Sequence, residues 1–545
     1  MAEEWSLPAV QDVLAAAVPD REMLVCGPIR RTFGEVAERT RSLAAFFGGH
    51  GLGLRRERHE LERWESGQDA VALVLHNGTE YVEAMLGAYR ARAVPFNVNQ
   101  HYRPSEVAAL LDDVDARAVV HHRSLGPLVR AAAGDRELVL VDVDDASGVE
   151  PLPGSTPFEV AAATPVDTPL PTPSPDDLYL VCTGGTTGAP KAVLWRQADI
   201  FVSAMGGAED LTPDRMAELA RTNRNGPSYP VTPLMHAAGQ WAAFAAFHMG
   251  SGIVLHDDRG SLDPRAVLQL TERERVWRLV IVGDAYAGPL VEELRRHPYD
   301  LSGLAMLGTG GAATGDHLKA ALVELLPHLL ILDGYGSSET GGMAYGARTA
   351  KGGGPGFSPT AGATVISADR TRVLEPGDDE IGWTARRGRV PLGYLDDRAR
   401  TEATFPVVEG ERMAIPGDRA QRLVDGSILM LGRDSLVVNT GGEKVFVEEV
   451  EDVLRRHPDV ADALVIGRPS DRFGQEVVAV VAPRVGATLD PPALREYVGD
   501  AIARYKAPRA VLVCDAVRRL ANGKADYGWA KEVAVSAIDV TVERR

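Results

Sequence analysis

The most constraining feature of the chain is a loop rich in glycine and threonine between two short apolar stretches. Residues 178–182, Leu-Tyr-Leu-Val-Cys, have the character of a strand and lead directly into Thr183–Lys191, after which Ala192–Trp195 has the character of a second strand. Glycines let backbone N–H groups approach an anion closely, threonine hydroxyls add donors, and Lys191 supplies a positive charge. The pattern predicts a hairpin whose loop holds a polyphosphate.

The same loop excludes the Walker A motif. That motif needs Gly-Lys-Ser/Thr at the start of a helix, whereas Lys191 follows Pro190 and precedes a strand. A flexible turn without a ligand stays open as the alternative, because single motifs mislead. The residues expected to contact phosphate are Thr183, Gly184, Gly185, Thr186, Thr187, Gly188 and Lys191.

Length and composition limit the class of protein. A chain of 545 residues is too long for one hydrophobic core, so roughly two to four domains are expected. The formal net charge of −18 argues against nucleic acid as the main partner. Cys26, Cys182 and Cys514 are widely separated, which fits a reducing compartment and argues against a disulfide framework or zinc site. Without a signal core or a long apolar run, the expectation is a cytoplasmic protein with no transmembrane segment.

Alternating apolar stretches and helical patterns indicate an α/β fold. A first series has expected strands at 71–75, 93–96 and 118–120 and helices at 80–91 and 104–112. A second series has expected strands at 252–255, 279–282, 305–307 and 329–332 and helices at 264–274 and 314–326. The charged segment 55–67 is helical in composition and is expected to be a surface insertion.

The last third of the chain changes character. Residues 355–430 are rich in turns and short strands, which favours a small β subdomain, and the segment after Arg433 has the pattern of a compact α+β domain. In that domain helices are expected at 445–457 and 491–504, and strands at 463–466, 477–481 and 510–513. The predicted fold is a large N-terminal domain, 1–432, of two αβα-layered subdomains plus the β subdomain, followed by a smaller mobile α+β domain, 433–545.

Glycine-flanked polar clusters follow the loop in a particular order. They are Pro233–His236, Gly308–Ala312, Asp333–Gly341, Gly393-Tyr394, Pro416–Asp418, Gly432-Arg433, Gly441–Val445 and Asn522–Lys524. This ordered set resembles the adenylate-forming superfamily of acyl-CoA synthetases, non-ribosomal adenylation domains and luciferases, from about residue 70 to 530. The run Gly-Gly-Glu-Lys-Val-Phe-Val-Glu-Glu-Val-Glu, which starts at Gly441, is most similar to the fatty-acyl-CoA synthetase branch.

The resemblance implies a two-step reaction. A carboxylate attacks the α-phosphorus of ATP to give an acyl adenylate and pyrophosphate, and the thiol of CoA then displaces AMP. Because the carboxylate and the triphosphate repel each other, the site must neutralise charge and align the attack. The implied partners are therefore a small-molecule carboxylic acid, ATP, Mg²⁺ and CoA as a co-substrate.

The resemblance also assigns roles to residues. Glu339 would hold Mg²⁺, with Ser338 beside it near the α-phosphate. Lys524 would bridge the carboxylate and α-phosphate oxygens as charge builds, and it forms the implied catalytic set together with Lys191 and Glu339. The adenosine would be framed by Gly311, Ala312, Asp333, Gly334, Tyr335, Gly336, Asp418 and Arg433.

In this family the small domain rotates between the two half-reactions. Gly441 and Gly442 would line a narrow passage for the pantetheine arm, where side chains would clash. Lys444, or an arginine such as Arg468 or Arg472, would pair with the CoA phosphates.

The acyl pocket is expected near residues 236–244 and 308–313. Its predicted members are His236, Trp241, Phe244 and Gly310. Small alanines in these segments favour a sizeable apolar acid, although close helix packing explains them equally well. No buried basic residue is evident to meet a second carboxylate, and fatty, aryl-alkanoic and sterol-derived acids all stay open.

Several assignments have simpler alternatives. Glu339 fits a solvated loop acid, Asp418 and Lys524 fit turn residues, Tyr335 fits a core aromatic and His236 fits a structural histidine. The chain also departs from the family pattern, because Leu436 stands where many members carry a hinge Asp or Lys, and Gly184 where a Ser or Thr is common. Two other functions stay open: an adenylating enzyme whose acceptor is a carrier-protein thiol or an amine, and an inactive nucleotide- or acyl-binding protein. A homodimer is equally open.

Overall fold

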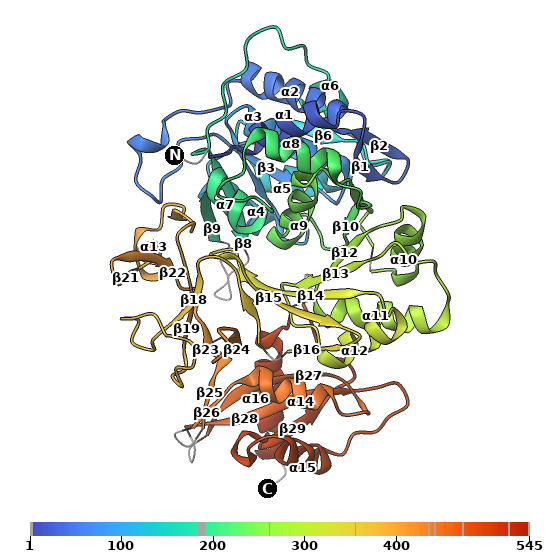
Figure 1. The fold of residues 1–545 in the computed structure, drawn as a ribbon, viewed down its shortest axis with the longest axis vertical. Coiled ribbons are helices and arrows are strands. Elements are labelled where there is room, and N and C mark those ends of the chain that lie inside the picture. The colour runs from blue at the N-terminus through green and yellow to red at the C-terminus, as the bar shows by residue number, and fades with distance from the viewer. Residues whose placement is uncertain are drawn as a thin grey trace.

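The computed structural model describes residues 4–183, 191–260, 262–354, 356–433, 436–440, 443–470, 474–520 and 524–542. Only the backbone is described at 433, 439, 443, 444, 474 and 537–542. Figure 1 shows two layered α/β parts and a small β part above a smaller C-terminal part, which confirms the predicted fold class.

The first sheet is parallel, with strand order β4-β3-β5-β6-β7. Its strands are β3 (Ala70–Val74), β4 (Val94–Asn97), β5 (Ala116–His122), β6 (Val139–Val143) and β7 (Thr156–Pro157). Its helices are α2 (Phe33–Gly49), α3 (Thr79–Arg90), α4 (Pro104–Asp113), α5 (Gly126–Ala133) and α6 (Phe158–Ala161). Val71 and Leu73 join the core formed with α2 and α3, whereas Ala72 and Val74 join the core formed with α4 and α5. Helices therefore cover both faces, as the continuous apolar strands predict.

The second sheet has strand order β16-β15-β14-β13-β12-β10-β11-β1-β2, with β17 paired to β15. Its strands are β1 (Glu22–Cys26), β2 (Ile29–Thr32), β10 (Ser228–Pro230), β11 (Ile253–Leu255), β12 (Arg278–Ile281), β13 (Met306–Gly310), β14 (Leu330–Ser337), β15 (Gly341–Thr349), β16 (Gly352–Gly353) and β17 (Ser358–Pro359). The hairpin β1–β2, which the sequence pattern does not place, extends this sheet because β1 pairs in parallel with β11.

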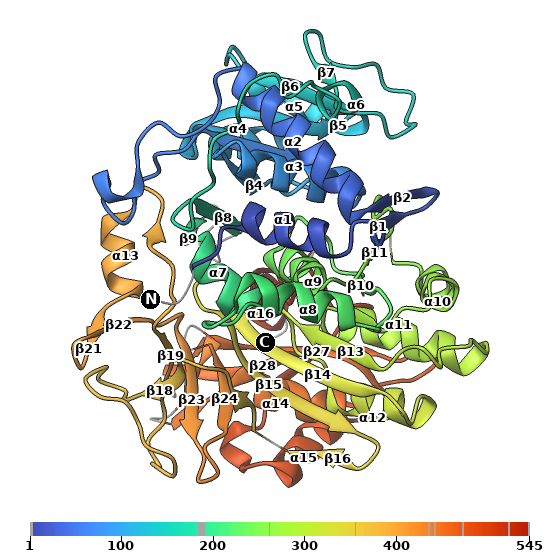
Figure 2. The same cartoon turned by 45° about the horizontal axis from the view of Figure 1, so that its top comes forward.

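Helices cover the second sheet on both faces. One group is α10 (Pro264–Arg273), α11 (Gly283–Arg296) and α12 (Asp316–Leu325). The other is α1 (Leu7–Ala17), α7 (Gln197–Ala204), α8 (Pro213–Thr222) and α9 (Ala237–His248). Figure 2 shows this second group between the two sheets, where it shares one hydrophobic core with α2 and α3.

The phosphate-loop hairpin forms a small sheet of its own. Strand β8 (Leu178–Thr183) pairs antiparallel with β9 (Lys191–Arg196), and β20 (Gly393–Tyr394) pairs with the other edge of β9. The expected β subdomain follows, with β18 (Ala363–Ile366), β19 (Gly382–Arg387), β21 (Val407–Val408), β22 (Glu411–Ala414), β23 (Asp418–Arg422), β24 (Ile428–Arg433) and the helix α13 (Arg398–Thr404).

The C-terminal part is an α+β unit built on a five-stranded sheet, order β26-β25-β28-β27 with β29 beside β28. Its elements are β25 (Val438–Thr440), β26 (Glu443–Val445), α14 (Val447–Arg455), β27 (Val460–Ser470), β28 (Gly474–Pro483), α15 (Pro491–Ala501), β29 (Ala510–Val513) and α16 (Tyr527–Val542), with a short 3-10 turn at Arg504–Lys506. The helix expected to start at 445 begins two residues later because Glu443–Val445 pairs with β25.

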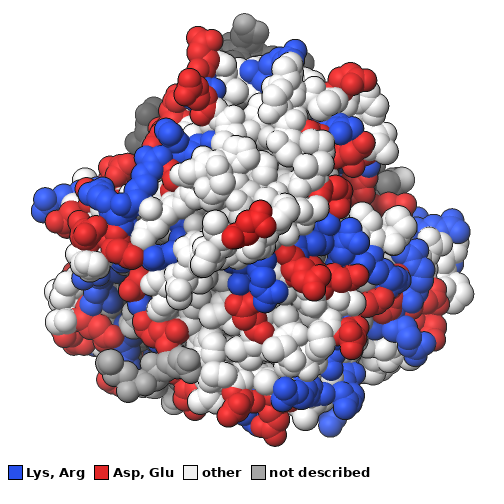
Figure 3. Space-filling model, turned by 90° about the horizontal axis from the view of Figure 1, so that it is seen from above, with Lys and Arg blue, Asp and Glu red and all other residues white. Residues whose placement is uncertain are grey.

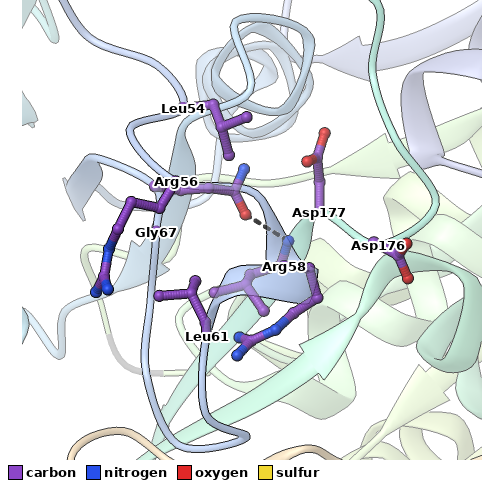
Figure 4. A pocket seen from close by; sticks show the side chains of 9 residues that line it. Leu54, Arg56, Arg58, Leu61, Gly67, Asp176 and Asp177 are labelled. Atoms are coloured by element: carbon purple, nitrogen blue, oxygen red, sulfur yellow. Dashed lines mark hydrogen bonds between the residues drawn. The ribbon is translucent and has the colours of Figure 1, made fainter.

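The charged segment 55–67 is not a helix, contrary to the expectation from its composition. Apart from a 3-10 turn at Arg58–Glu60 it is a loop. It has no apolar stripe to bury against the protein, and packing of such a stripe is what stabilises most helices. The Arg58 guanidinium instead donates to the carbonyl oxygen of Glu65 at 2.7 Å. The loop covers a small cavity beside Asp176 and Asp177 (Figure 4), and no predicted site residue lines it.

Charge is mixed on one face of the molecule. On the face in Figure 3, acidic and basic side chains alternate, so the net charge of −18 does not form one acidic field there. Among the helices in the described ranges, none has the length and apolar character needed to cross a bilayer.

Buried amide side chains connect the first sheet to the phosphate-loop hairpin and to the segment before α9. The Asn97 amide nitrogen donates to the carbonyl oxygens of Cys182 (2.8 Å) and Met235 (2.7 Å), and its oxygen accepts from the Cys182 N–H at 2.9 Å. The Asn77 side chain accepts from the Leu234 N–H at 2.7 Å, and Gln240 donates to the Leu234 carbonyl oxygen at 2.8 Å. Three buried amides therefore set the position of Leu234–Met235 relative to the hairpin.

We predict that Asn97→Leu lowers the thermal unfolding midpoint. The substitution leaves the Cys182 N–H and two carbonyl oxygens without their partner, and each unsatisfied buried group costs about 1–3 kcal/mol. Asn99→Leu is the matched control, because the Asn99 side chain accepts from the His101 N–H in an exposed turn. Equal midpoints for the two variants in differential scanning calorimetry would contradict the role of Asn97.

Candidate active site

The β8–β9 hairpin brings the first predicted site residues together. Thr183 and Lys191 are directly opposite each other at the end of the ladder, so the strands lead into the loop as the sequence predicts. The loop residues Gly184, Gly185, Thr186, Thr187 and Gly188 lie outside the described residues. Their phosphate contacts stay a prediction.

Glu339 lies in the turn between β14 and β15, next to the hairpin. Its Oε1 accepts a hydrogen bond from the Tyr394 hydroxyl at 2.8 Å, and the Lys191 Nζ lies 5.9 Å from the centroid of the Tyr394 ring. Burial and the negative charge of Glu339 raise the pKa of Tyr394, which keeps the hydroxyl protonated as a donor. The turn is also held by the Trp195 indole N–H, which donates to the Ser338 carbonyl oxygen at 2.9 Å.

The predicted adenine segments are adjacent in the second sheet. The parallel register of β13 and β14 pairs Gly310 with Gly334 and Thr309 with Asp333. Gly311 has φ +76°, a left-handed conformation that favours glycine, and this turns the chain at Gly311–Ala312 away from the end of β13. A Cβ at Gly310 would lie 2.7 Å from the Gly334 carbonyl oxygen, so close strand contact requires glycine there.

Polar side chains at this edge of the sheet form hydrogen bonds and an ion pair with one another. The Asp333 carboxylate accepts from the Lys319 ammonium at 2.8 Å, and both side chains are mostly buried. The Tyr335 hydroxyl donates to the Asp418 carboxylate, and it lies 3.3 Å from the Thr384 hydroxyl oxygen. The structure thus brings Tyr335 and Asp418 together, whereas it pairs Asp333 with a lysine that the sequence analysis did not select.

Asp418 and Arg433, which are predicted to bind the ribose, lie on the β23–β24 ladder. Its register places Arg433 opposite Asp418, as expected for two residues at one subsite. The Arg433 side chain lies outside the described residues. Gly336 is also in close contact with β15, since a Cβ there would collide with the Gly341 carbonyl oxygen.

His236 precedes the first turn of α9 and is held by the Leu234–Met235 segment. Its Nε2 is buried and has no hydrogen-bond partner among the described residues. Burial, and next the positive charge of Lys524, lower the pKa of His236 to about 4, so the ring is neutral at physiological pH. Trp241 lies one turn further along and is partly buried, whereas Phe244 is 1% exposed and packs edge-on against Phe247.

Lys524 comes from the C-terminal part, far along the chain from His236. It lies on an exposed loop after β29, where its carbonyl oxygen accepts from the Leu520 N–H at 2.8 Å. Its positive charge contributes, after burial, to the lowered pKa of His236.

The predicted CoA residues are less fully described. Gly441, Gly442 and Arg472 lie outside the described residues, and Lys444 is described only as backbone in β26. The Arg468 guanidinium is paired with the Glu476 carboxylate at 2.7 Å within the C-terminal sheet. The CoA contacts stay a prediction.

Several residues that shape the site were missed by sequence reasoning. Tyr394 belongs to one of the ordered clusters, Gly393-Tyr394, but its hydroxyl contact with Glu339 depends on β20 pairing with β9. Trp195, Asn97 and Lys319 act through side-chain contacts between segments distant in sequence, which no local pattern signals.

The comparisons with known proteins agree with this geometry. The family described as AMP-binding enzyme matches residues 12–383, and its C-terminal domain matches residues 449–524. The chain is 43% identical to the medium-chain acyl-CoA ligase Mig of Mycobacterium avium over 98% of both chains. It is 36% identical to the 3-oxocholest-4-en-26-oate–CoA ligase of Rhodococcus rhodochrous, over 94% of this chain and 93% of that protein.

Solved structures show the same fold. The anthranilate CoA ligase AuaEII, in complex with anthranoyl-AMP, superposes with a TM-score of 0.80 at 19% identity, over 98% of this chain and 99% of that one. The resemblance inferred from the ordered motifs is thereby confirmed: the chain belongs to the AMP-binding enzyme family, in its AMP-forming acyl-CoA ligase branch.

Proposed function

We propose that this ligase joins CoA to a hydrophobic acid, either a medium- or long-chain fatty acid or the side-chain carboxylate of a steroid. The observation that carries this substrate class is the 43% and 36% identity, over nearly full length, to a medium-chain acyl-CoA ligase and a 3-oxocholest-4-en-26-oate–CoA ligase. The small residues of α9 and the glycines of β13 support an acyl site of that size.

In the proposed first step the acid attacks the α-phosphorus of ATP. Lys191 and the hairpin loop neutralise the β- and γ-phosphates, and Asp418 accepts from the ribose hydroxyls. Lys524 stabilises the negative charge that builds on the attacked oxygens. Support comes from the charge of Lys524, which contributes to the lowered pKa of His236, because the acid's carboxylate must lie between the acyl site and the nucleotide.

Glu339 is the residue proposed to hold Mg²⁺. In the described ranges, no three acidic, histidine or cysteine side chains are grouped so as to hold a metal ion. One carboxylate completed by phosphate oxygens and water is a common arrangement for Mg²⁺, and the Tyr394 hydroxyl orients this carboxylate. When bound, the ion neutralises phosphate charge.

The second step is proposed to follow a rotation of residues 433–545 relative to 1–432. Two hydrophobic clusters of the C-terminal part consist only of residues after 435, which supports a unit that moves as one body. Gly441, Gly442 and Lys444 are the proposed contacts of CoA in that second arrangement.

The function is tested by incubating the purified protein with ATP, Mg²⁺ and a panel of fatty, aryl-alkanoic and steroid acids, with and without CoA. Pyrophosphate release should depend on the acid, and AMP release should depend on CoA. Turnover with an amine or a carrier-protein thiol but not with CoA would contradict the acceptor, and no turnover with any acid would contradict the function.

We predict that Lys524→Ala lowers the rate of acyl-adenylate formation by about 10²-fold or more, because a positioned charge is lost from the transition state. The rate of thioester formation from supplied acyl-AMP should change little. Lys531→Ala, an exposed lysine on α16, is the matched control. The rates of both half-reactions are measured by quenched flow. Equal losses of rate in the two half-reactions would rule out the assignment.

We predict that Glu339→Gln raises the Mg²⁺ concentration needed for half-maximal adenylation by roughly tenfold or more, because a ligand charge is removed. Tyr394→Phe, which removes only the hydrogen bond to that carboxylate, should cause a smaller shift in the same direction. Glu375→Gln in an exposed turn is the control. If a Mg²⁺ titration of Glu339→Gln matches that of the unmodified protein, Glu339 is only a loop acid.

A further inference from the structure

One face of the second sheet is left partly uncovered beneath α9. Along β12, Leu279 and Ile281 are buried against α10–α12, whereas Arg278 and Val280 point to the opposite face and are only partly buried. The same alternation continues in β13, where Met306, Gly308 and Gly310 share that face. This half-exposed face contains Gly310, a residue predicted for the acyl pocket.

Glycines leave the main chain of this face without side chains next to larger residues. Gly308 and Gly310 lie two residues apart on β13, and Gly334 of β14 is directly opposite Gly310. The Tyr345 ring lies over Gly334, because a Cβ at Gly334 would be 3.3 Å from the Tyr345 Cε1. Helix α9 lies alongside β10, the neighbour of β12 (Figures 1 and 2). We call Gly308, Gly310 and Gly334 the glycine floor. The acyl chain is therefore expected to run between α9 and this glycine floor.

Arg278 is the unusual residue on this face, because it is a partly buried cation that forms no ion pair with a carboxylate in the described part of the chain. Its Nη2 donates to the Ala242 carbonyl oxygen of α9 at 3.1 Å, while its Nε is buried and has no hydrogen-bond partner in the described residues. No carboxylate among those residues forms an ion pair with it, and its cross-strand neighbour Ser228 also has a buried hydroxyl without a partner. Such groups are costly to bury unless something satisfies them.

The position of Arg278 corresponds to the far end of an acyl chain. Its strand partner Met306 precedes Gly310 by four residues, roughly 13 Å along the strand at about 3.3 Å per residue. On the helix side, Ala242 follows His236 by six residues, roughly 9 Å at about 1.5 Å per residue. Both measures place Arg278 well inside the protein from the site where the carboxylate reacts.

We infer that Arg278 is a specificity-determining residue that hydrogen-bonds an oxygen atom at the distal end of the acid, so that the enzyme prefers acids with a distal carbonyl group over unsubstituted ones. The inference rests on the proposed function and narrows its substrate class. It differs from the expectation from the sequence, in which no buried basic residue is evident to meet a second carboxylate. The Nε of the guanidinium is a donor without a partner among the described residues, and Ser228 adds a hydroxyl on the neighbouring strand.

The test compares decanoic acid with 9-oxodecanoic acid as substrates for CoA-dependent AMP formation. The unmodified protein should have a higher kcat/KM for the oxo acid, and Arg278→Met should lower that value about 10- to 100-fold while the value for decanoic acid stays level or rises. Arg275→Met, an exposed arginine three residues earlier, is the matched control and should leave both values unchanged.

A second measurement needs no variant and covers the case in which Arg278→Met does not fold. The unmodified protein should favour 9-oxodecanoic acid over its isomer 5-oxodecanoic acid, because only the distal oxygen reaches the guanidinium. Equal kcat/KM values for the two isomers, or an equal loss of activity on both acids in Arg278→Met, would overturn the inference. Absence of turnover with every acid in the unmodified protein would instead overturn the proposed function.

Discussion

The antiparallel ladder of β8 and β9 is the constraint on which the rest of the site depends. Its inner end positions Lys191 and Thr183, and its outer edge receives β20, which delivers Tyr394 to Glu339. On the β8 side, the backbone of Cys182 is satisfied by the Asn97 amide, which also fixes the segment before α9. Buried backbone groups must be paired. A displacement of the hairpin would therefore break its contacts to the first sheet, to β20 and to the segment before α9 at the same time.

Electrostatics explain why a protein of net charge −18 can bind polyanionic substrates. The cations of the proposed site are few and come from distant segments: Lys191 from the hairpin and Lys524 from the C-terminal part. The Lys191 Nζ lies 5.9 Å from the centroid of the Tyr394 ring, and the charge of Lys524 contributes to the lowered pKa of His236. In the proposed reaction this positive charge would act where phosphate and carboxylate meet, while the face in Figure 3 stays mixed in sign.

Much of the fold and of the site could be predicted from the sequence, because it rests on local signals. Apolar periodicity located β3, α3 and the strands β11, β12, β13 and β14 of the second sheet, and glycine-rich clusters located the ordered motifs. The failures involve long-range contacts. The hairpin β1–β2 joins a sheet whose other strands lie some two hundred residues later. Segment 55–67 is charged but has no apolar face to pack as a helix. Arg278 stands out only because no acidic side chain pairs with it in the described structure.

The glycine floor of the second sheet has a consequence for how this enzyme diversifies. A wall made of main chain offers no side chain to replace, and Gly310 cannot gain even a methyl group without colliding with the neighbouring strand. Changes in the proposed substrate range would then have to come from α9 and from the side chains beside the glycines, Tyr345 and Arg278. Descendants of this gene would be expected to keep these glycines and to exchange residues on the helix, so that divergence concentrates on one side of the proposed acyl site.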